Sequence, residues 1–327
     1  MKEVRIGTLG AATITPFSLL GPARKVQRAV VTAVAARDTD RARAFARKRG
    51  IAKVHESYDA LLADPEIDAI YNPLPNSLHY EWTMKAIGAG KHVLCEKPFT
   101  SNADEAERVR QAADASGCVV MEAFHWRYHP LAWRLEDIVR SGALGKIRFI
   151  ETWMCVPLPF PGDIRYRHDL AGGATMDVGS YAINMLRTLG GEEPVCTSAS
   201  AELKSPEIDR CMRAEFELPG GARGRINCSL LSKTLLRIGA HVRGDRGELR
   251  VLNPIMPHLY HRVRLRIDGT TRREKVRGEA TYIGQLRAFT DAVIDGTPIL
   301  TPPSEAVANM RVIDSVYQRA GLTPRGI

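Results

Sequence analysis

The chain has 327 residues, which is above the size at which single hydrophobic cores usually stop growing, so two domains are expected. Apolar residues make up 44% of it, but no apolar run approaches the roughly 20 residues of a membrane span, and the N-terminus lacks a signal-peptide pattern. The net charge of +9 is spread along the chain without an aromatic-interleaved basic stripe. We therefore expect a soluble cytoplasmic protein that binds neither a membrane nor nucleic acid.

The first 123 residues alternate strand and helix patterns, which predicts a doubly wound parallel sheet. Glycines follow several of the predicted helices and indicate where they end. The predicted strands are 4–9, 29–36, 68–71, 92–95 and 118–122, and the predicted helices are 38–49, 57–63, 78–89 and 102–116.

After residue 124 the segments become longer and alternate between apolar and polar residues, which is typical of an antiparallel sheet. Helices are expected at 132–141, 282–295 and 304–319, and strands at 145–156, 195–203, 210–217, 222–230, 235–243 and 261–268. The alternation predicts an apolar face larger than these helices can cover. We therefore expect a homodimer or homotetramer that packs through this face.

Six cysteines are present, and their spacing fits neither a zinc site nor a secreted disulfide framework. Cys95 and Cys118 each lie in an apolar run, so buried thiols in a reducing compartment are expected. The other cysteines are Cys155, Cys196, Cys211 and Cys228. From this spacing we predict no metal site.

A glycine turn follows the first strand, as in dinucleotide-binding motifs. The full motif would read G-x-G-x-x-G from Gly10, whereas this chain keeps only the first glycine and has Ala12 and Thr15 at the others. Alanine is the smallest alternative and still permits a ligand to approach the backbone. The strand–turn–helix context favours a dinucleotide site formed by Gly10, Ala11, Ala12, Thr13 and Ile14.

The end of the second strand indicates which dinucleotide binds. An acidic residue there would hydrogen-bond the ribose of NAD, whereas an arginine can hold the 2′-phosphate of NADP. Arg37 occupies this position, and Asp38 after it is expected to cap the next helix. NADP is therefore favoured over NAD, with Arg41 assisting. The alternatives are a solvated Arg37 and an Asp38 that binds the ribose.

Glu96 and Lys97 stand at the carboxyl end of strand 92–95, and Pro98 restricts Lys97 to extended backbone. Ligands bind at this edge of a parallel α/β sheet, so Lys97 is a candidate active-site group. The alternative on this stretch alone is a surface lysine on a tight turn.

Four stretches resemble the Gfo/Idh/MocA oxidoreductase family, which is named for glucose–fructose oxidoreductase and inositol dehydrogenase. They are 10–12, 72–79, 89–98 and 171–181, and the third, Ala-Gly-Lys-His-Val-Leu-Cys-Glu-Lys-Pro, is the most specific. The resemblance covers nearly the whole chain. It implies an N-terminal Rossmann domain at 1–123 and, at 124–327, a substrate-binding and oligomerisation domain with a large, open, mainly antiparallel sheet.

The resemblance also implies a role for the residues that follow strand 92–95. In this family the lysine of Glu-Lys-Pro reaches the oxygen of the reacting carbon, the proline is commonly cis, and the glutamate lies near the nicotinamide ribose. Lys97 would then be catalytic and Glu96 would contact the cofactor. An ammonium at hydrogen-bond distance stabilises the alkoxide that develops during hydride transfer.

Asp177 and Tyr181 are four residues apart in a helical pattern and are expected on one face with Asn184. Many family members carry His and Asp where this chain has Tyr181 and Asn184. The tyrosine resembles the subgroup of dimeric dihydrodiol dehydrogenase, glucose–fructose oxidoreductase and NADP-dependent xylose dehydrogenase. The resemblance implies that Tyr181 transfers the substrate proton, with Lys97 stabilising its phenolate and Asp177 orienting Lys97 or a substrate hydroxyl. The alternative is a polar pair that satisfies nearby backbone groups.

Further candidates complete the site. Arg165 resembles a segment that approaches cofactor and substrate in the tyrosine subgroup. His79 would either touch the cofactor or cap its turn, and Arg127 would point into the ligand cleft. The expected cofactor contacts therefore also include Pro73, Leu74, Asn76, His79, Trp126 and Arg127.

Together with Arg37, the resemblance implies an NADP-dependent oxidoreductase that transfers a hydride to or from a secondary alcohol or ketone of a sugar-like polyol. Trans-dihydrodiol oxidation is the alternative within this class, because both substrates present vicinal hydroxyls. A non-catalytic NAD(P)-binding sensor and a nucleic-acid-binding protein are alternatives from other classes. The presence of both Lys97 and Tyr181 argues against the sensor.

Overall fold

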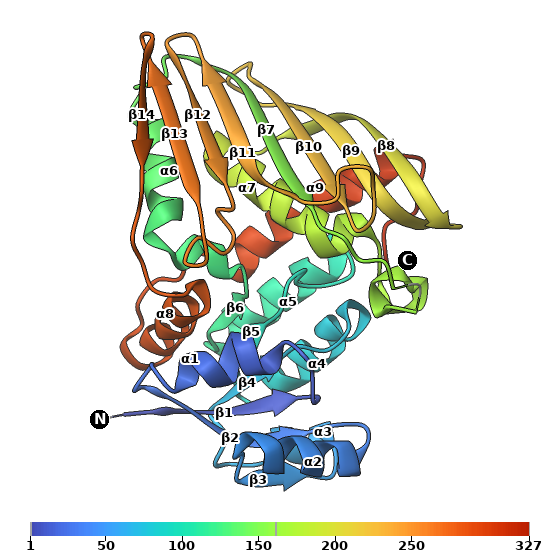
Figure 1. The fold of residues 1–327 in the computed structure, drawn as a ribbon. Coiled ribbons are helices and arrows are strands. Elements are labelled where there is room, and N and C mark those ends of the chain that lie inside the picture. Colours follow the sequence, from blue (N-terminus) through green and yellow to red (C-terminus); the bar gives the residue numbers. More distant parts are fainter. Residues whose placement is uncertain (1, 161, 327) are drawn as a thin grey trace. The chain divides into compact units, whose positions relative to one another are not determined.

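The computed structural model describes residues 2–160 and 162–326, and Figure 1 shows the fold. The chain divides into two compact units, Met1–Tyr128 with Tyr282–Val307, and His129–Thr281 with Ala308–Ile327. The predicted class is confirmed, since one described sheet is a parallel Rossmann-like sheet and the other is mainly antiparallel. The functional division after residue 123 stays a prediction, and the compact units differ from it by placing Tyr282–Val307 with the first unit.

The sheet of the first unit has the order β3-β2-β1-β4-β5-β6 and only parallel pairs among its described strands. Its order reverses at β1, which lies between β2 and β4, and ligands of such sheets bind at this switch point. The short β3 was not predicted. The strands are β1 (Val4–Leu9), β2 (Ala29–Ala35), β3 (Lys53–His55), β4 (Ala69–Asn72), β5 (His92–Cys95) and β6 (Val120–Glu122).

The helices of the first unit begin and end at residues that suit helix termini. Asp38, Ser57 and Asn102 each accept a backbone hydrogen bond at an N-terminus, and Gly50 and Gly117 end helices in the left-handed conformation. The helical segments are η1 (Pro16–Leu20, a π-helix), α1 (Gly21–Ala23), α2 (Thr39–Arg49), α3 (Tyr58–Leu62), η2 (Asn76–Leu78), α4 (His79–Gly88), α5 (Ala103–Ser116), η3 (His125–Tyr128) and α8 (Thr281–Asp295).

The sheet of the second unit has the order β14-β13-β12-β11-β7-β10-β9-β8 and is antiparallel except for the β7–β10 pair (Figure 1). Two of its strands, β12 and β14, were not predicted. The strands are β7 (Ile147–Cys155), β8 (Val195–Ser205), β9 (Ile208–Glu217), β10 (Arg223–Ser229), β11 (Arg237–Gly244), β12 (Gly247–Leu252), β13 (Arg262–Ile267) and β14 (Thr270–Glu274).

One face of this sheet packs against helices of the same unit. Ile150 and Ile226 lie on this face and are buried, and the Thr152 hydroxyl donates to the Ala182 carbonyl of α7 at 2.8 Å. Helical segments of this unit are α6 (Pro130–Arg140), η4 (Ile164–Tyr166), η5 (His168–Leu170), η6 (Thr175–Gly179, a π-helix) and α7 (Ser180–Gly190), with most of α9 (Pro303–Arg319).

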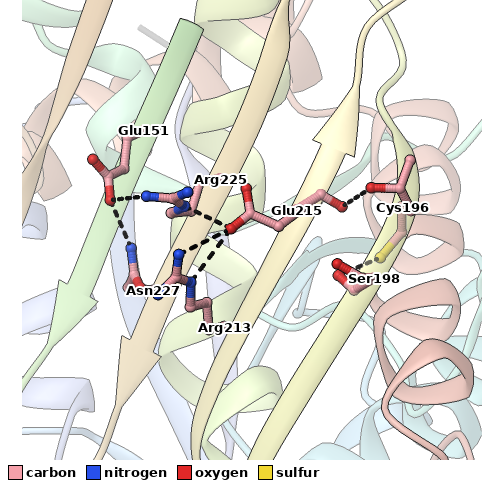
Figure 2. A network of polar contacts seen from close by, with 8 residues as sticks. Glu151, Cys196, Ser198, Arg213, Glu215, Arg225 and Asn227 are labelled. Carbon is pink, nitrogen blue, oxygen red and sulfur yellow. Dashed lines mark hydrogen bonds and ion pairs between the residues drawn. The ribbon is translucent and has the colours of Figure 1, made fainter.

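The opposite face of the sheet, here called the outer face, is charged (Figure 2). Glu215 accepts hydrogen bonds from Arg213 at 3.1 Å and from Arg225 at 2.7 Å, and Glu151 accepts one from Asn227 at 3.1 Å. The expectation of an uncovered apolar face is therefore wrong. On β7 and β10 the buried apolar set packs against α7, and the opposite set carries ion pairs across the strands.

Candidate functional site

The glycine turn after β1 exposes backbone at the switch point of the first unit. Gly10 has a φ of +80°, and its amide donates to the Ala35 carbonyl of β2 at 2.6 Å. A Cβ at this position would lie 3.2 Å from Leu74, in a backbone conformation that side chains rarely adopt, so glycine suits it. Ala11 and Ala12 are half-buried and Thr13 is exposed. The turn can therefore receive a ligand.

Two arginines accompany this turn. Arg41 donates from its guanidinium to the Ala11 carbonyl at 3.1 Å, and Arg37 is exposed and forms no ion pair within residues 2–160 and 162–326. Asp38 accepts from the Arg41 backbone amide at 3.0 Å, so its predicted capping role is confirmed. Burial raises the pKa of the neighbouring Tyr58, against the charges of Arg37 and Arg41. Both guanidiniums are available to a phosphate near the turn.

The loops after β4 and β5 are joined by a buried histidine. His79 is 1% exposed, and its ring nitrogens lie 2.7 Å from the carbonyl oxygens of Leu74 and Pro98. Burial lowers the pKa of His79 to about 4, so the ring carries one proton at neutral pH and donates to one of these carbonyls. These contacts favour the turn-holding alternative for His79, while a contact with the cofactor stays a prediction.

A chain of hydroxyls links η1 to Glu96. The Ser18 hydroxyl lies 3.0 Å from the Ile14 carbonyl and 2.6 Å from the Tyr71 hydroxyl, and Tyr71 donates to Glu96 at 2.7 Å. Burial raises the pKa of Tyr71 well above its usual value, so the hydroxyl stays protonated and can donate. Sequence reasoning missed Ser18 and Tyr71, although a tyrosine inside a buried strand signals that its hydroxyl needs a partner.

Lys97 lies just beyond the carboxyl end of β5 and is half-buried. Its peptide bond to Pro98 is cis, as the family resemblance implied. Trp126 and Arg127 lie in η3 and are 0% and 9% exposed, with the Arg127 guanidinium 5.9 Å from the Trp126 ring. Trp126 is thus a core residue of the first unit, and cofactor contacts for this pair stay predictions.

In the second unit the structure brings Arg165 and Asp177 together. The Arg165 Nε lies 2.9 Å from Asp177 Oδ2, and its Nη1 lies 3.0 Å from Asp163 Oδ2. Asp177, and then Asp163, raise the pKa of Arg165. Sequence reasoning named Arg165 and Asp177 separately and gave no signal that they pair. The expected role of Asp177 in orienting Lys97 or a substrate hydroxyl stays a prediction.

Asp177 and Tyr181 lie on consecutive helical segments, the π-helix η6 and the α-helix α7. Single π-helical turns occur often at functional sites. The Asp177 side chain is 20% exposed, whereas Tyr181 and Asn184 are 6% and 2% exposed. The second unit thus offers a partly exposed carboxylate–guanidinium pair near a buried phenol. Within the described ranges, no group of three or more His, Cys, Asp or Glu could hold a metal.

Family models match both parts of the chain. The model described as an oxidoreductase family with an NAD-binding Rossmann fold matches residues 4–124, and the GFO/IDH/MocA C-terminal domain matches residues 133–250. The chain belongs to the Gfo/Idh/MocA oxidoreductase family. The resemblance inferred from the four sequence stretches is therefore confirmed.

Several members of the family are similar to this chain over most of its length. D-xylose 1-dehydrogenase (NADP(+)) 2 of Haloferax volcanii is 34% identical, with 96% of each chain covered. Trans-1,2-dihydrobenzene-1,2-diol dehydrogenase of Sus scrofa is 31% identical, with 68% of this chain and 66% of its own covered. A 3-ketoreductase from Actinomadura kijaniata, solved with NADP and TDP-benzene, has a TM-score of 0.90 and 28% identity, with 98% of each chain covered.

The residues of the first unit fit the dinucleotide that this family binds. The glycine turn has the positive φ and open backbone that a pyrophosphate requires, and the Arg37 and Arg41 guanidiniums supply positive charge beside it. Glu96 is held in place by Tyr71 at the same sheet edge. The candidate cofactor residues of this Gfo/Idh/MocA oxidoreductase thus lie on the first unit, and Arg165, Asp177 and Tyr181 lie on the second.

Proposed function

We propose that the protein is an NADP-dependent oxidoreductase acting on a secondary alcohol or ketone of a sugar or sugar-like polyol, with Lys97 and Tyr181 handling the substrate oxygen. The observation that carries the proposal is a lysine–tyrosine pair whose spacing this chain shares with a relative. The A. kijaniata 3-ketoreductase was also solved as a lysine-to-alanine and a tyrosine-to-phenylalanine variant. The two replaced positions are separated by the same number of residues as Lys97 and Tyr181.

NADP supplies or accepts the hydride at the nicotinamide ring when it is bound. In the oxidising direction, the Tyr181 phenolate accepts the proton of the substrate hydroxyl while the carbon loses its hydride. In the reducing direction, the Tyr181 phenol returns this proton to the developing alkoxide. A free tyrosine has a pKa of about 10, so the phenolate needs help, which the Lys97 ammonium supplies by its charge.

Asp177 and Arg165 orient the substrate in this proposal. Arg165 pairs with Asp177, and in this proposal the carboxylate accepts a hydrogen bond from a neighbouring hydroxyl of the substrate. A sugar-like polyol or a dihydrodiol offers such a second hydroxyl beside the reacting one. This requirement supports a vicinal diol or hydroxyketone as substrate and does not by itself separate the two classes. Trans-dihydrodiol oxidation is retained as the second candidate because of the Sus scrofa relative.

The choice of NADP rests on Arg37 and on the named cofactor of two relatives. Arg37 extends beyond the end of β2, is exposed, and has no acid paired with it among the described residues. A planar guanidinium binds a phosphate through two parallel hydrogen bonds. Since Asp38 already caps α2, its carboxylate is less available to a ribose.

The protein also forms, in our proposal, a homodimer or homotetramer through the eight-stranded sheet. Arg237 stacks on Trp153 at 3.7 Å and Arg243 on Phe149 at 4.5 Å on the outer face, and arginine and aromatic residues are enriched at interfaces. A monomer in light scattering at micromolar concentration would contradict this assembly.

The free cysteines support a reducing compartment, which we propose is the cytoplasm. No helix in 2–160 or 162–326 is both long and apolar enough to cross a membrane.

The test is the change in reduced-nicotinamide absorbance across sugars, sugar ketones and trans-dihydrodiols, with NADP⁺/NADPH and NAD⁺/NADH in parallel. Turnover of a sugar with NADP supports the proposal, and turnover of dihydrodiols alone supports the second candidate. Turnover only with NAD would show that Arg37 does not select the cofactor. Tight NADP binding without turnover of any substrate would favour a non-catalytic sensor.

A further inference from the structure

A buried charged cluster lies at the start of the helical segment that carries Asp177 and Tyr181. Asp209 of β9 and Arg325 near the C-terminus are both 0% exposed, and they form an ion pair at 3.2 Å. Asp209 Oδ2 accepts from the Thr175 backbone amide and from the Thr175 hydroxyl, each at 2.7 Å. Thr175 is the first residue of η6 and is itself fully buried.

Arg325 is held by backbone as well as by charge. Its Nε donates to the Gly172 carbonyl at 2.8 Å, and its Nη2 donates to the Glu207 carbonyl at 2.6 Å. Gly172 precedes η6, so Arg325 binds the chain just before the helix while Asp209 binds the first residue of the helix. One ion pair therefore fixes this segment at two successive points.

The two glycines of this segment permit the close packing. A Cβ on Gly173 would collide with the Asp209 carboxylate, and a Cβ on Gly172 would lie 2.6 Å from the Arg165 carbonyl. Gly173 also has a φ of +129°, which side chains rarely adopt. The segment is therefore confined between the Asp209–Arg325 pair on one side and the loop that carries Arg165 on the other.

We propose that Asp209, held by Arg325, is a positioning residue for the reaction, because it fixes Thr175 and through it the placement of Asp177 and Tyr181. This inference rests on the proposed function of those two residues. A buried carboxylate needs its partners, so the cluster admits few alternative arrangements of the helix start. Small displacements of groups that orient a substrate reduce turnover strongly.

The chain offers a matched pair of variants. Thr175→Val and Tyr317→Phe each remove one buried hydroxyl that donates to Asp209, at 2.7 Å and 3.0 Å respectively. Only Thr175 belongs to the segment that leads to Asp177, since Tyr317 approaches from α9. We expect similar losses of melting temperature from the two variants.

We expect kcat to fall about tenfold in Thr175→Val and by less than about twofold in Tyr317→Phe, with the Kd for NADPH unchanged in both. Arg325→Lys, which keeps the charge, should retain more activity than Arg325→Met. Equal kcat in the two hydroxyl variants, or a Thr175→Val enzyme with wild-type kcat, would overturn the proposal.

Amide hydrogen exchange of residues 171–181 in the same variants measures how firmly this segment is held, and it does not depend on turnover. Faster exchange in Thr175→Val than in Tyr317→Phe supports the positioning role, and equal exchange overturns it. Absence of turnover in the wild-type protein with every substrate would contradict the proposed function. The exchange comparison would still decide whether Asp209 fixes this segment, so the two failures are distinguishable.

Discussion

The two units carry functional residues in different ways. In the first unit, the candidate groups follow the ends of parallel strands, where short local motifs such as Gly10-Ala11-Ala12 and Glu96-Lys97-Pro98 set the backbone. In the second unit, the helix start that carries Asp177 is held by partners from outside the helix, Arg165, Asp209 and Arg325. Local sequence therefore sets the backbone of the first site, whereas polar contacts from other segments of the chain hold the helix start of the second.

The largest expected effect tests the first unit. Lys97→Ala should lower kcat about a thousandfold, because the ammonium that we propose to stabilise the developing charge is lost, while NADPH still binds. Steady-state kinetics and NADPH fluorescence titration measure the two quantities. Lys85→Ala, which removes an exposed lysine paired with Glu81 on α4, is the control and should leave both unchanged. Near-normal turnover in Lys97→Ala would rule out the proposed mechanism.

Tyr181→Phe is the corresponding test of the second unit, because it removes the Tyr181 hydroxyl. We expect kcat to fall about a hundredfold, because the proposed proton donor is removed while the buried ring is retained. Stopped-flow hydride transfer with bound NADPH would show whether the chemical step itself is slowed. If kcat is retained and only KM rises, Tyr181 binds substrate without transferring its proton.

Sequence reasoning succeeded where local chemistry decides the structure. The parallel sheet, the Asp38 cap and the cis Lys97–Pro98 bond were all expected from residues close together in the chain or from the family motif that they form. Their geometry depends on backbone propensity and on neighbours within a few positions, which a sequence displays directly.

The failures have a different cause. The expected apolar face, larger than the helices could cover, is not found on the outer face, because alternation alone does not show how much of the apolar set the helices cover. The Arg165–Asp177 and Asp209–Arg325 pairs were not foreseen, because a charged residue can pair with many acids and only the tertiary fold selects one.

A smaller effect tests whether Arg37 selects the cofactor. Arg37→Ala should raise the Kd for NADPH about fiftyfold and leave the Kd for NADH within about twofold, since only the former has a 2′-phosphate to lose. Arg47→Ala removes another exposed arginine from the same segment of chain and serves as the control for general charge. Equal weakening of both cofactors by Arg37→Ala would assign Arg37 to the pyrophosphate instead.

The smallest effect concerns stability and the loops that His79 joins. The pKa of His79 is lowered to about 4 in the folded protein, against about 6.5 when unfolded, so the unfolded state binds the extra proton first. The stability that the neutral His79 ring contributes to the folded protein is therefore present above pH 6.5 and is lost as the pH falls towards 4. Between pH 7 and pH 5 this loss amounts to about 2 kcal/mol in the free energy of unfolding.

Denaturant unfolding of the wild type and of His79→Gln at both pH values measures this contribution. The wild type should lose about 2 kcal/mol more than the variant on going to pH 5, because the variant has no imidazole to protonate. His168→Gln removes an exposed histidine and should keep the wild-type pH dependence. If His79→Gln also keeps it, the ring is charged in the folded state at pH 5. The imidazolium would then donate to both the Leu74 and the Pro98 carbonyls, and its charge would hold the turn that carries Lys97.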